Sequence, residues 1–337
     1  MLDTDAHMTN SVARGIPGNA VLVPPGQPEE KEIMANWRME GKPLVSICCA
    51  TFNHAGYLRD ALSGFLFQKT SFPFEIIIRD DASTDGTTEI VKEYAQRYPN
   101  IVRAVIEIEN QFKKGVRATH AWPSLAKGEF IALCEGDDFW TSPDKLQRQV
   151  ELLRKYSAAV MSVALTHVCR QEGNELHYLN TTAAHTDELL GFEEIHKNYY
   201  HTSTYLMRSN IFKAVIKEHF DGHALYGDTA LRAIMITQGQ FAQLAEVVSV
   251  YRITGSGLWT SMDRELQLLW EFDVARKLAS TLPGVHGEHQ RGRLFGLTKC
   301  LLRQHMKNFS ILKSVKLVPL VFWYGLIKLP RNAMRRP

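Results

Sequence analysis

The sequence of 337 residues predicts an α/β protein in which helices cover both faces of a mostly parallel sheet. From residue 43 to about residue 155, short β-branched or apolar runs alternate with stretches of helical character. Three of these runs end abruptly in polar or acidic side chains, and open α/β sheets bind their ligands at the carboxyl ends of the strands. The alternation therefore predicts the sheet, and the strand ends predict where its ligand site lies.

The elements are expected in the following order. Residues 1–40 are rich in Gly and Pro, lack an apolar period and predict a disordered leader. The alternating series is strand 44–50, helix 56–68, strand 74–80, helix 84–98, strand 101–107, helix 117–126, strand 130–134 and helix 143–155. Beyond residue 158 the alternation weakens, and the expected elements are strand 159–168, a return strand ending near 179, strand 202–208, helices 209–219 and 226–238, strand 241–251 and mainly helix over 262–329.

Three carboxylates, Glu135, Asp137 and Asp138, follow the buried run 130–134 directly. Like charges this close repel unless a cation or a donor-rich ligand neutralises them, and carboxylate oxygens favour Mg²⁺ or Mn²⁺ holding a phosphate. The alternative is a solvated acidic turn that caps the next helix. A second acidic pair, Asp80 and Asp81, ends the strand 74–80, so the same pattern occurs twice.

The net charge of +3 hides an asymmetry along the chain, which has 39 basic and 36 acidic residues. Eleven Lys and Arg and no acidic residue follow Glu288, which leaves 28 basic against 36 acidic residues in the body. Within the tail, residues 317–327 are apolar and aromatic but too short to cross a bilayer, so they predict either a segment lying in an anionic membrane interface or a packed helix. Five cysteines without C-x-x-C spacing, and no signal pattern, favour a reducing cytoplasm. If the tail lies in the interface, the protein is peripheral at the inner face of the cell membrane.

Three motifs together resemble the inverting family 2 glycosyltransferases of the GT-A fold. They are the strand 45–50 leading into Thr51, Phe52 and Asn53, the turn 80–86, and the segment 128–138. The resemblance covers about residues 43–255 and implies a GT-A domain over 41–260, with a nucleotide-binding half at 43–140 and an acceptor half at 141–260. A helical, basic C-terminal extension over 261–337 then follows.

The resemblance also implies roles for individual residues. Phe52 matches the aromatic residue that stacks on the nucleotide base, and Asp81, or its neighbour Asp80, matches the carboxylate that accepts a base N–H. Asp137 and Asp138 match the D-x-D element that binds the divalent metal, Mn²⁺ or Mg²⁺, and the diphosphate. Two positions depart from the family, because Ala50 replaces the usual proline and Glu135 stands where the first Asp of D-x-D is usual. The expected nucleotide-sugar site comprises Ala50, Thr51, Phe52, Asn53, Asp80, Asp81, Arg117, Glu135 and Asp137. Arg117 is included because the loop between the third and fourth strands would let it contact a phosphate, and the alternative is a solvated helix residue.

Asp228 is the expected catalytic base, because the acidic residue opening the corresponding helix has that role in the family. As a general base it would remove the proton of the attacking hydroxyl while the metal stabilises the departing diphosphate. The alternative is that Asp228 only caps the helix. His54, His201 and Arg208 are candidate supporting groups, and the alternative for a lone histidine near a strand is a hydrogen-bonded structural role. Trp140 belongs either to the wall of the sugar pocket or to the core.

The expected activity is non-processive transfer of a hexose, because the Q-x-x-R-W pattern of processive synthases and their spanning helices are absent. The donor is a nucleotide-diphosphate sugar, with UDP-sugars favoured, and the acceptor is a glycan or a lipid-linked sugar of the bacterial envelope. Two rival functions are a catalytically silent nucleotide-sugar binding protein and a nucleotidyltransferase, whose Gly-rich phosphate loop is missing. The acidic body argues against a nucleic-acid partner.

Overall fold

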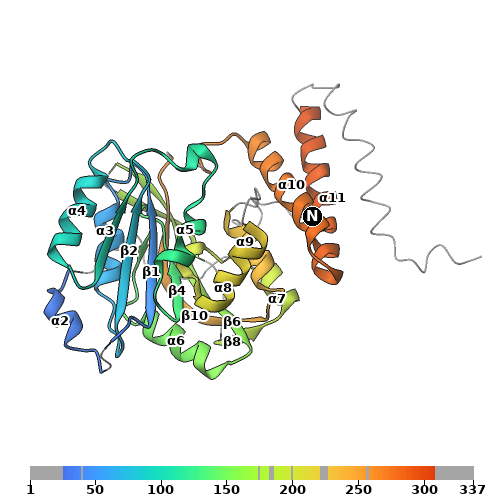
Figure 1. Cartoon of the computed structure of the whole chain (residues 1–337). Coiled ribbons are helices and arrows are strands. Elements are labelled where there is room, and N and C mark those ends of the chain that lie inside the picture. Colours follow the sequence, from blue (N-terminus) through green and yellow to red (C-terminus); the bar gives the residue numbers. More distant parts are fainter. Residues whose placement is uncertain are drawn as a thin grey trace, which may run out of the picture. The chain divides into compact units, whose positions relative to one another are not determined.

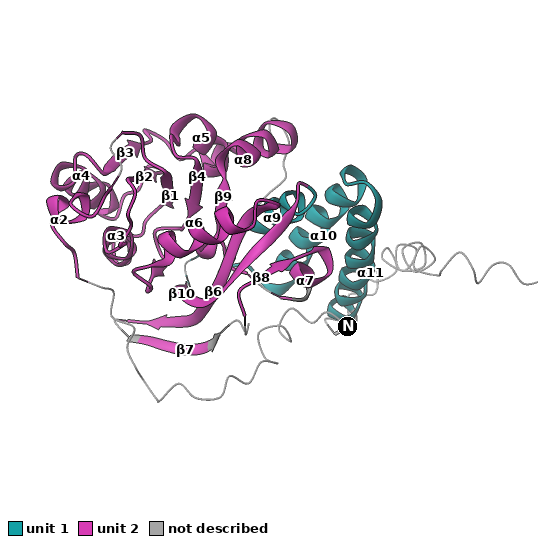
Figure 2. Cartoon of the chain, turned by 90° about the horizontal axis from the view of Figure 1, so that it is seen from below, with its two compact units in different colours: residues 1–4, 225–237, 255–337 teal, residues 5–224, 238–254 magenta. Residues whose placement is uncertain are grey.

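The computed structural model describes residues 26–38, 41–173, 175–181, 186–198, 200–220, 227–255, 257 and 259–307. The chain divides into two compact units, shown in different colours in Figure 2. The larger unit comprises residues 5–224 and 238–254, and the smaller unit comprises 1–4, 225–237 and 255–337. The helix that carries Asp228 groups with the C-terminal helices.

A ten-stranded mixed sheet forms the centre of the larger unit (Figure 1). The strand order is β3-β2-β1-β4-β9-β6-β10-β5, with β7 beside β6 and β8 beside β10. The strands are β1 (Val45–Thr51), β2 (Phe74–Asp80), β3 (Val102–Ile106), β4 (Phe130–Leu133), β5 (Phe139–Trp140), β6 (Ala159–Glu172), β7 (Glu175–Thr181), β8 (Glu188–Leu190), β9 (Leu206–Arg208) and β10 (Gln240–Ile253). The first four strands along the chain pair in parallel, as the sequence predicted.

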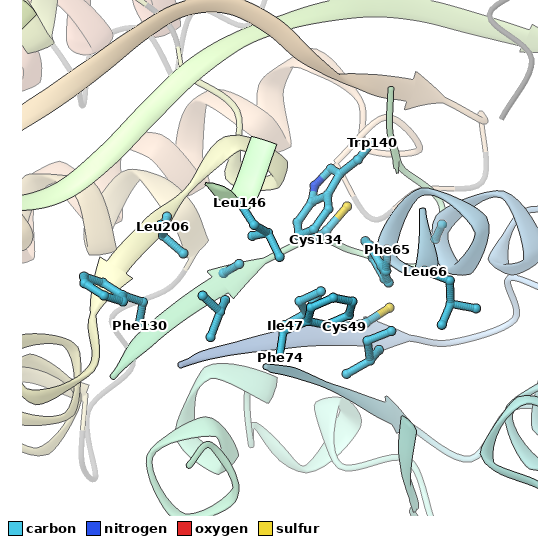
Figure 3. Close-up of a cluster of buried hydrophobic side chains, with 14 of the residues drawn as sticks. Ile47, Cys49, Phe65, Leu66, Phe74, Phe130, Cys134, Trp140, Leu146 and Leu206 are labelled. Atoms are coloured by element: carbon cyan, nitrogen blue, oxygen red, sulfur yellow. The ribbon is translucent and has the colours of Figure 1, made fainter. Parts of the chain in front are cut away.

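The core of the larger unit lies between one face of the sheet and three helices, α3 (Leu58–Leu66), α4 (Thr87–Arg97) and α6 (Lys145–Lys155). Ile47 and Cys49 of β1 point into this layer, and Phe65 packs edge-on against Trp140 with ring centroids 4.7 Å apart (Figure 3). Gly64 makes the packing possible, because a Cβ there would lie 2.7 Å from the Trp140 carbonyl oxygen. The alternation of strands and amphipathic helices thus yields the predicted helix-covered sheet.

On the opposite face, α5 (Ala118–Leu125) contacts α8 (Ser209–Val215), which also contacts β4 and β9. A π-helical turn, Ile216–Phe220, continues α8. Two further short elements of this unit are the helix α7 (Phe192–Lys197) and a 3₁₀ helix, Phe112–Lys114, before α5. The sequence did not predict α7, β5 or β8, since two to six residues are too few to show a periodicity.

The strand expected over 202–208 is wrong in its first half, where the chain forms a 3₁₀ helix, Thr202–Thr204. The cause is local hydrogen bonding by small hydroxyl side chains, which competes with a strand ladder. The Thr204 hydroxyl and amide both donate to the His201 carbonyl oxygen, at 2.8 and 3.0 Å respectively. Only Leu206–Arg208 pairs as strand β9.

The leader expected to be disordered over 1–40 is ordered in its described part, residues 26–38. A short helix, α2 (Glu30–Met34), buries Ile33, and Trp37 packs edge-on against Phe74 of β2 with centroids 5.7 Å apart. Ile33 and Trp37 are four residues apart and lie on one side of the chain, which gives this segment enough apolar surface to dock. Residues 1–25 lie outside the described part of the chain.

The smaller unit contains three described helices, α9 (Gly227–Met235), α10 (Arg264–Thr281) and α11 (Gly284–Lys307). A small apolar core joins α10 and α11 through Leu268, Ala275, Leu294, Leu297 and Leu301. Asp263 caps α10 by accepting a hydrogen bond of 2.8 Å from the Leu266 amide. Across the described residues no helix combines the length and apolarity needed to span a membrane, and the tail segment 317–327 lies outside them.

Candidate functional site

The ends of β1, β2 and β4 meet at one edge of the sheet, because the three strands are parallel neighbours. The Asp81 amide donates to the Thr51 carbonyl oxygen at 3.0 Å, on one side of β1. On the other side, the Gly136 amide donates to the Ala50 carbonyl oxygen at 2.9 Å. The two acidic segments predicted from the sequence therefore flank a single strand end.

The loop after β1 is held by the turn after β2, and it presents Phe52 to solvent. Asn53 adopts a left-handed conformation with φ 55°, its side-chain oxygen accepts the Thr84 amide at 2.9 Å, and its own amide donates to the Ser83 hydroxyl at 2.8 Å. Asp85 accepts the Ala55 amide at 3.0 Å. Asn53 is thus occupied in shaping the loop, whereas Phe52 is 38% exposed and can stack on a flat ligand.

The two aspartates after β2 have different surroundings. Asp80 is fully buried and accepts hydrogen bonds from the Ser83 amide and from the hydroxyls of Ser83 and Thr88. Asp81 is only partly buried, and its two oxygens accept the amides of Gln111 and Phe112 at 2.8 and 3.0 Å. Asp80 therefore builds the turn, and Asp81 is the carboxylate of the pair that lies near the surface.

Phe112 is a site residue that sequence reasoning missed. It is 37% exposed, its amide is held by Asp81, and the Arg117 guanidinium lies 3.8 Å above its ring. Arg117 was predicted to contact a phosphate, and the structure places it in this cation–π pair beside the Asp81 loop. The available signal was an aromatic residue in the polar run 110–114, which has no core to fill.

Gly136 brings the acidic segment close to the end of β1. A Cβ at this position would lie 2.8 Å from Thr51 Oγ1 and 3.1 Å from His54 Nδ1, two buried polar atoms that have no hydrogen-bond partner in the described chain. The neighbouring Asp137 has an 18% exposed side chain, and its Oδ2 lies 3.8 Å from His54 Nε2. Polar atoms that are buried and unsatisfied here fit a site that a ligand completes.

Asp138 points into the protein. It is 2% exposed, accepts the Arg252 amide at 2.8 Å, and its Oδ2 lies 3.5 Å from His201 Nδ1. Burial, reinforced by Asp137 and Glu135, raises the pKa of Asp138 well above its usual range. His201 also stacks on Tyr251 with ring centroids 4.2 Å apart. Asp138 and His201 are therefore buried structural residues behind the site at the strand ends.

The donor set suits a divalent cation that is held mainly by its substrate. Among the described residues, no group of three or more His, Cys, Asp and Glu is placed to hold a metal. Mg²⁺ usually keeps several waters and binds through one or two carboxylates together with substrate phosphates. Asp137, with exposed carboxylate surface, fits that role, whereas the oxygens of Asp138 face the Arg252 amide and His201.

Two other expected site residues are structural. The Trp140 indole is buried and donates from Nε1 to the Ser203 carbonyl oxygen at 2.7 Å, which assigns it to the core. Arg208 pairs with Phe130, at the end of β4 opposite to the acidic segment, and donates to the carbonyl oxygens of Ala159 and Leu153 at 2.8 and 2.6 Å. Neither residue lies at the strand edge that carries Phe52 and Asp137.

A buried lysine, Lys145 at the start of α6, packs against Trp140 in the larger unit. Lys145 Nζ lies 4.0 Å from the ring centroid of Trp140 and donates to Gln149 Oε1 at 2.8 Å. Gln149 in turn donates to the Thr204 carbonyl oxygen at 2.8 Å. Because the side chain is removed from water, burial lowers the pKa of Lys145 from its ordinary value of 10.5 to about 7.

We expect the lysine to make stability depend on pH. Between pH 7 and 10.5 the unfolded chain binds a proton at Lys145 that the folded chain has lost, so folding stability rises with pH through this window. The gain is on the order of 5 kcal/mol. Below pH 7 both states are protonated and the full cost of burial remains. Lys145→Met should remove this dependence and stabilise the protein most at pH 6.

Urea unfolding at pH 6, 8 and 10 measures the effect, with Lys155→Met as the matched control. Lys155 ends the same helix but is exposed, so its replacement should leave the pH profile of the wild type unchanged. Parallel stability curves for the wild type and Lys145→Met would show that Lys145 keeps its proton in the folded state.

In the smaller unit, Asp228 lies in the first turn of α9. Its Oδ1 accepts the amide of the adjacent Thr229 at 2.6 Å and the Thr229 hydroxyl at 3.4 Å. An N-cap would instead accept an amide two or three residues ahead. The capping alternative therefore does not account for Asp228, whose Oδ2 accepts no hydrogen bond from the described residues.

Comparison with known proteins gives concordant matches. A family model described as Glycosyl transferase family 2 matches residues 46–219. The chain is 33% identical over 260 residues to the uncharacterized protein Rv1520 of Mycobacterium tuberculosis, which covers 75% of this chain and 72% of that protein. It is 32% identical over 166 residues to Bacillus subtilis TuaG, named as a candidate teichuronic acid biosynthesis glycosyltransferase, with 49% of this chain and 60% of TuaG covered.

Two solved structures share the fold at low identity. Staphylococcus aureus TarS 1–349, crystallised with UDP-GlcNAc, superposes with a TM-score of 0.55 at 17% identity over 78% of this chain and 72% of that one. The mannosyltransferase PcManGT of Pyrobaculum calidifontis, in complex with GDP-Man and Mn²⁺, gives a TM-score of 0.52 at 15% identity over 90% and 88%.

Proposed function

Because this chain belongs to glycosyl transferase family 2, we propose that it is a metal-dependent, inverting enzyme that moves one sugar from a nucleotide-diphosphate donor to a hydroxyl acceptor. The family membership confirms the family that the motifs indicated. The fold is the expected GT-A fold, and helices follow it at the C-terminal side. The observation that carries the proposal is the convergence of Phe52, Asp81 and Asp137 around the end of β1.

Each of these residues has a separate role in donor binding. The exposed ring of Phe52 stacks on the nucleotide base, and Asp81 accepts a base N–H with a lone pair that the amides of Gln111 and Phe112 leave over. Asp137 holds a divalent ion, Mn²⁺ or Mg²⁺, together with the diphosphate. When bound, the ion acts as a Lewis acid that stabilises negative charge on the leaving diphosphate.

Asp228 is proposed as the general base on the acceptor side. Its Oδ2 is open to accept a proton from the attacking hydroxyl, while Thr229 fixes the carboxylate through Oδ1. Attack on the face of the sugar opposite the leaving group inverts the anomeric centre. The buried cysteines do not compete for this chemistry, because burial raises the pKa of Cys49 and Cys134 well above the ordinary thiol value.

The donor and acceptor classes are supported by the relatives. The TarS structure contains UDP-GlcNAc, the PcManGT structure contains GDP-Man, and TuaG is named for teichuronic acid biosynthesis. We favour a UDP-hexose as donor and an envelope glycan or lipid-linked sugar as acceptor.

A cytoplasmic site of action agrees with five free cysteines, four of them buried. Membrane association through the tail stays a prediction, and liposome flotation of a chain ended after Lys307 tests it: full retention of lipid binding would contradict it.

A nucleotide-sugar panel with Mn²⁺ or Mg²⁺ tests the function. We expect release of nucleotide diphosphate from one donor, stimulated by cell-envelope extract as a source of acceptor and abolished by chelation of the metal. Donor binding without any release would instead favour the silent binding protein. Release of pyrophosphate from a nucleoside triphosphate and a sugar phosphate would favour the nucleotidyltransferase.

A further inference from the structure

Arg232, on α9 of the smaller unit, is a cation without a described partner. It lies four residues after Asp228, so the two side chains share one face of the helix. No ion pair within 4 Å joins Arg232 to Asp228 or to another described carboxylate, and its Nη1 is buried without a hydrogen bond. A guanidinium nitrogen removed from water without an acceptor carries a substantial desolvation cost.

A neighbouring ion pair is already complete. Glu271 of α10 accepts a hydrogen bond of 3.4 Å from Arg293 of α11. Burial lowers the pKa of Arg293, and Glu271 opposes that effect most strongly while Arg232 adds to it. Asp228 lies close enough to contribute to raising the pKa of Glu271, so these four groups form one electrostatic cluster. Glu271 is thus matched by Arg293, and Arg232 is the unmatched member.

Arg232 is only partly buried, so part of its side chain is accessible to a ligand from solvent. The planar fork of arginine suits bidentate binding of phosphate and carboxylate. An oxyanion at the accessible part of the Arg232 side chain would give this guanidinium an acceptor that the described chain does not supply.

We propose that Arg232 binds an oxyanion, a phosphate or a carboxylate, that the acceptor carries near its reacting hydroxyl. This inference rests on the proposed role of Asp228 as the base, because only then does the anion on the same helix face belong to the acceptor. The enzyme would accordingly select acidic acceptors over neutral ones. Arg232 positions the acceptor, and Asp228 removes its proton.

Thermal unfolding of the full chain in EDTA tests the site without metal, donor or turnover. The probes are inorganic phosphate and glucuronate, each compared with chloride at equal ionic strength. At about ten times its dissociation constant, the preferred anion should raise the Tm of the wild type by roughly 2–4 °C. Arg232→Gln should lose this shift, and Arg232→Lys, which keeps the charge but not the fork, should retain part of it.

Two controls separate this proposal from the donor site. Arg276→Gln removes an exposed arginine that pairs with Asp273 on α10, and it should keep the full shift. Asp137→Ala acts on the donor side and should also keep it, even where sugar transfer is lost. An equal shift in Arg232→Gln and the wild type, or no shift with either anion in the wild type, would overturn the site whether or not the enzyme transfers sugar. The stronger of the two probes assigns phosphate or carboxylate.

Discussion

Asp137→Ala is expected to lower metal-dependent sugar transfer by roughly 10²–10³-fold, because stabilisation of the leaving diphosphate by a metal is worth several kcal/mol. Asp137 has an 18% exposed side chain and follows Gly136, whose amide binds the Ala50 carbonyl oxygen near the end of β1. The loss should appear first as weaker donor binding in the presence of Mn²⁺. Titration calorimetry of the donor, with and without the metal, measures it.

Asp144→Ala provides the matched control for this loss. Asp144 lies seven residues further along the same segment, is exposed, and makes no capping hydrogen bond with its side chain. Its replacement should leave transfer and donor binding unchanged. Should Asp137→Ala bind the donor with undiminished dependence on Mn²⁺, the assignment of the metal to this residue is wrong.

Asp228→Asn is expected to keep donor binding and to lose transfer by about 10²–10⁴-fold, the range that a positioned general base supplies. The amide oxygen of asparagine can still accept the Thr229 amide, so the first turn of α9 should keep its geometry. What disappears is the carboxylate that takes the proton of the acceptor hydroxyl. Transfer rates and donor affinity are measured on the same preparations.

Asp263→Asn is the matched control in the same unit. It opens α10 as an N-cap, and asparagine caps as well as aspartate does, so stability and transfer should remain at the wild-type level. If Asp228→Asn transferred sugar at the normal rate, a group other than Asp228 would be the general base. The assignment of the donor site would not be affected by that result.

The sheet edge proposed to bind the donor could be predicted from the sequence, because its position depends on local patterns. The β-branched run 74–80 and the apolar run 130–134 each predict a buried strand, observed as β2 (Phe74–Asp80) and β4 (Phe130–Leu133). The acidic residues at their carboxyl ends share one edge because the strands run in the same direction. Phe52 could be placed at the edge for the same reason. The bounds of β2 agree with the prediction, because a turn follows the strand directly.

The sequence could not predict which carboxylate of each acidic pair is buried and which is accessible. Asp80 and Asp81 are adjacent, yet one is buried in a turn and the other reaches the Phe112 loop, and this depends on the β3 connection 30 residues away. Asp137 and Asp138 differ in the same way, since the amide that binds Asp138 comes from Arg252 on β10. No local pattern encodes a partner so distant in the chain.

The sequence by itself determined the alternation of strands and helices, the family and the strand edge that gathers the acidic residues, because these follow from hydrophobic period and short motifs. The tertiary structure alone decided which acidic residues face inward, that residues 26–38 dock on the sheet, that Lys145 is buried and that Nη1 of Arg232 is removed from water. The physical reason is that desolvation and hydrogen-bond partnership depend on packing between segments far apart in the chain.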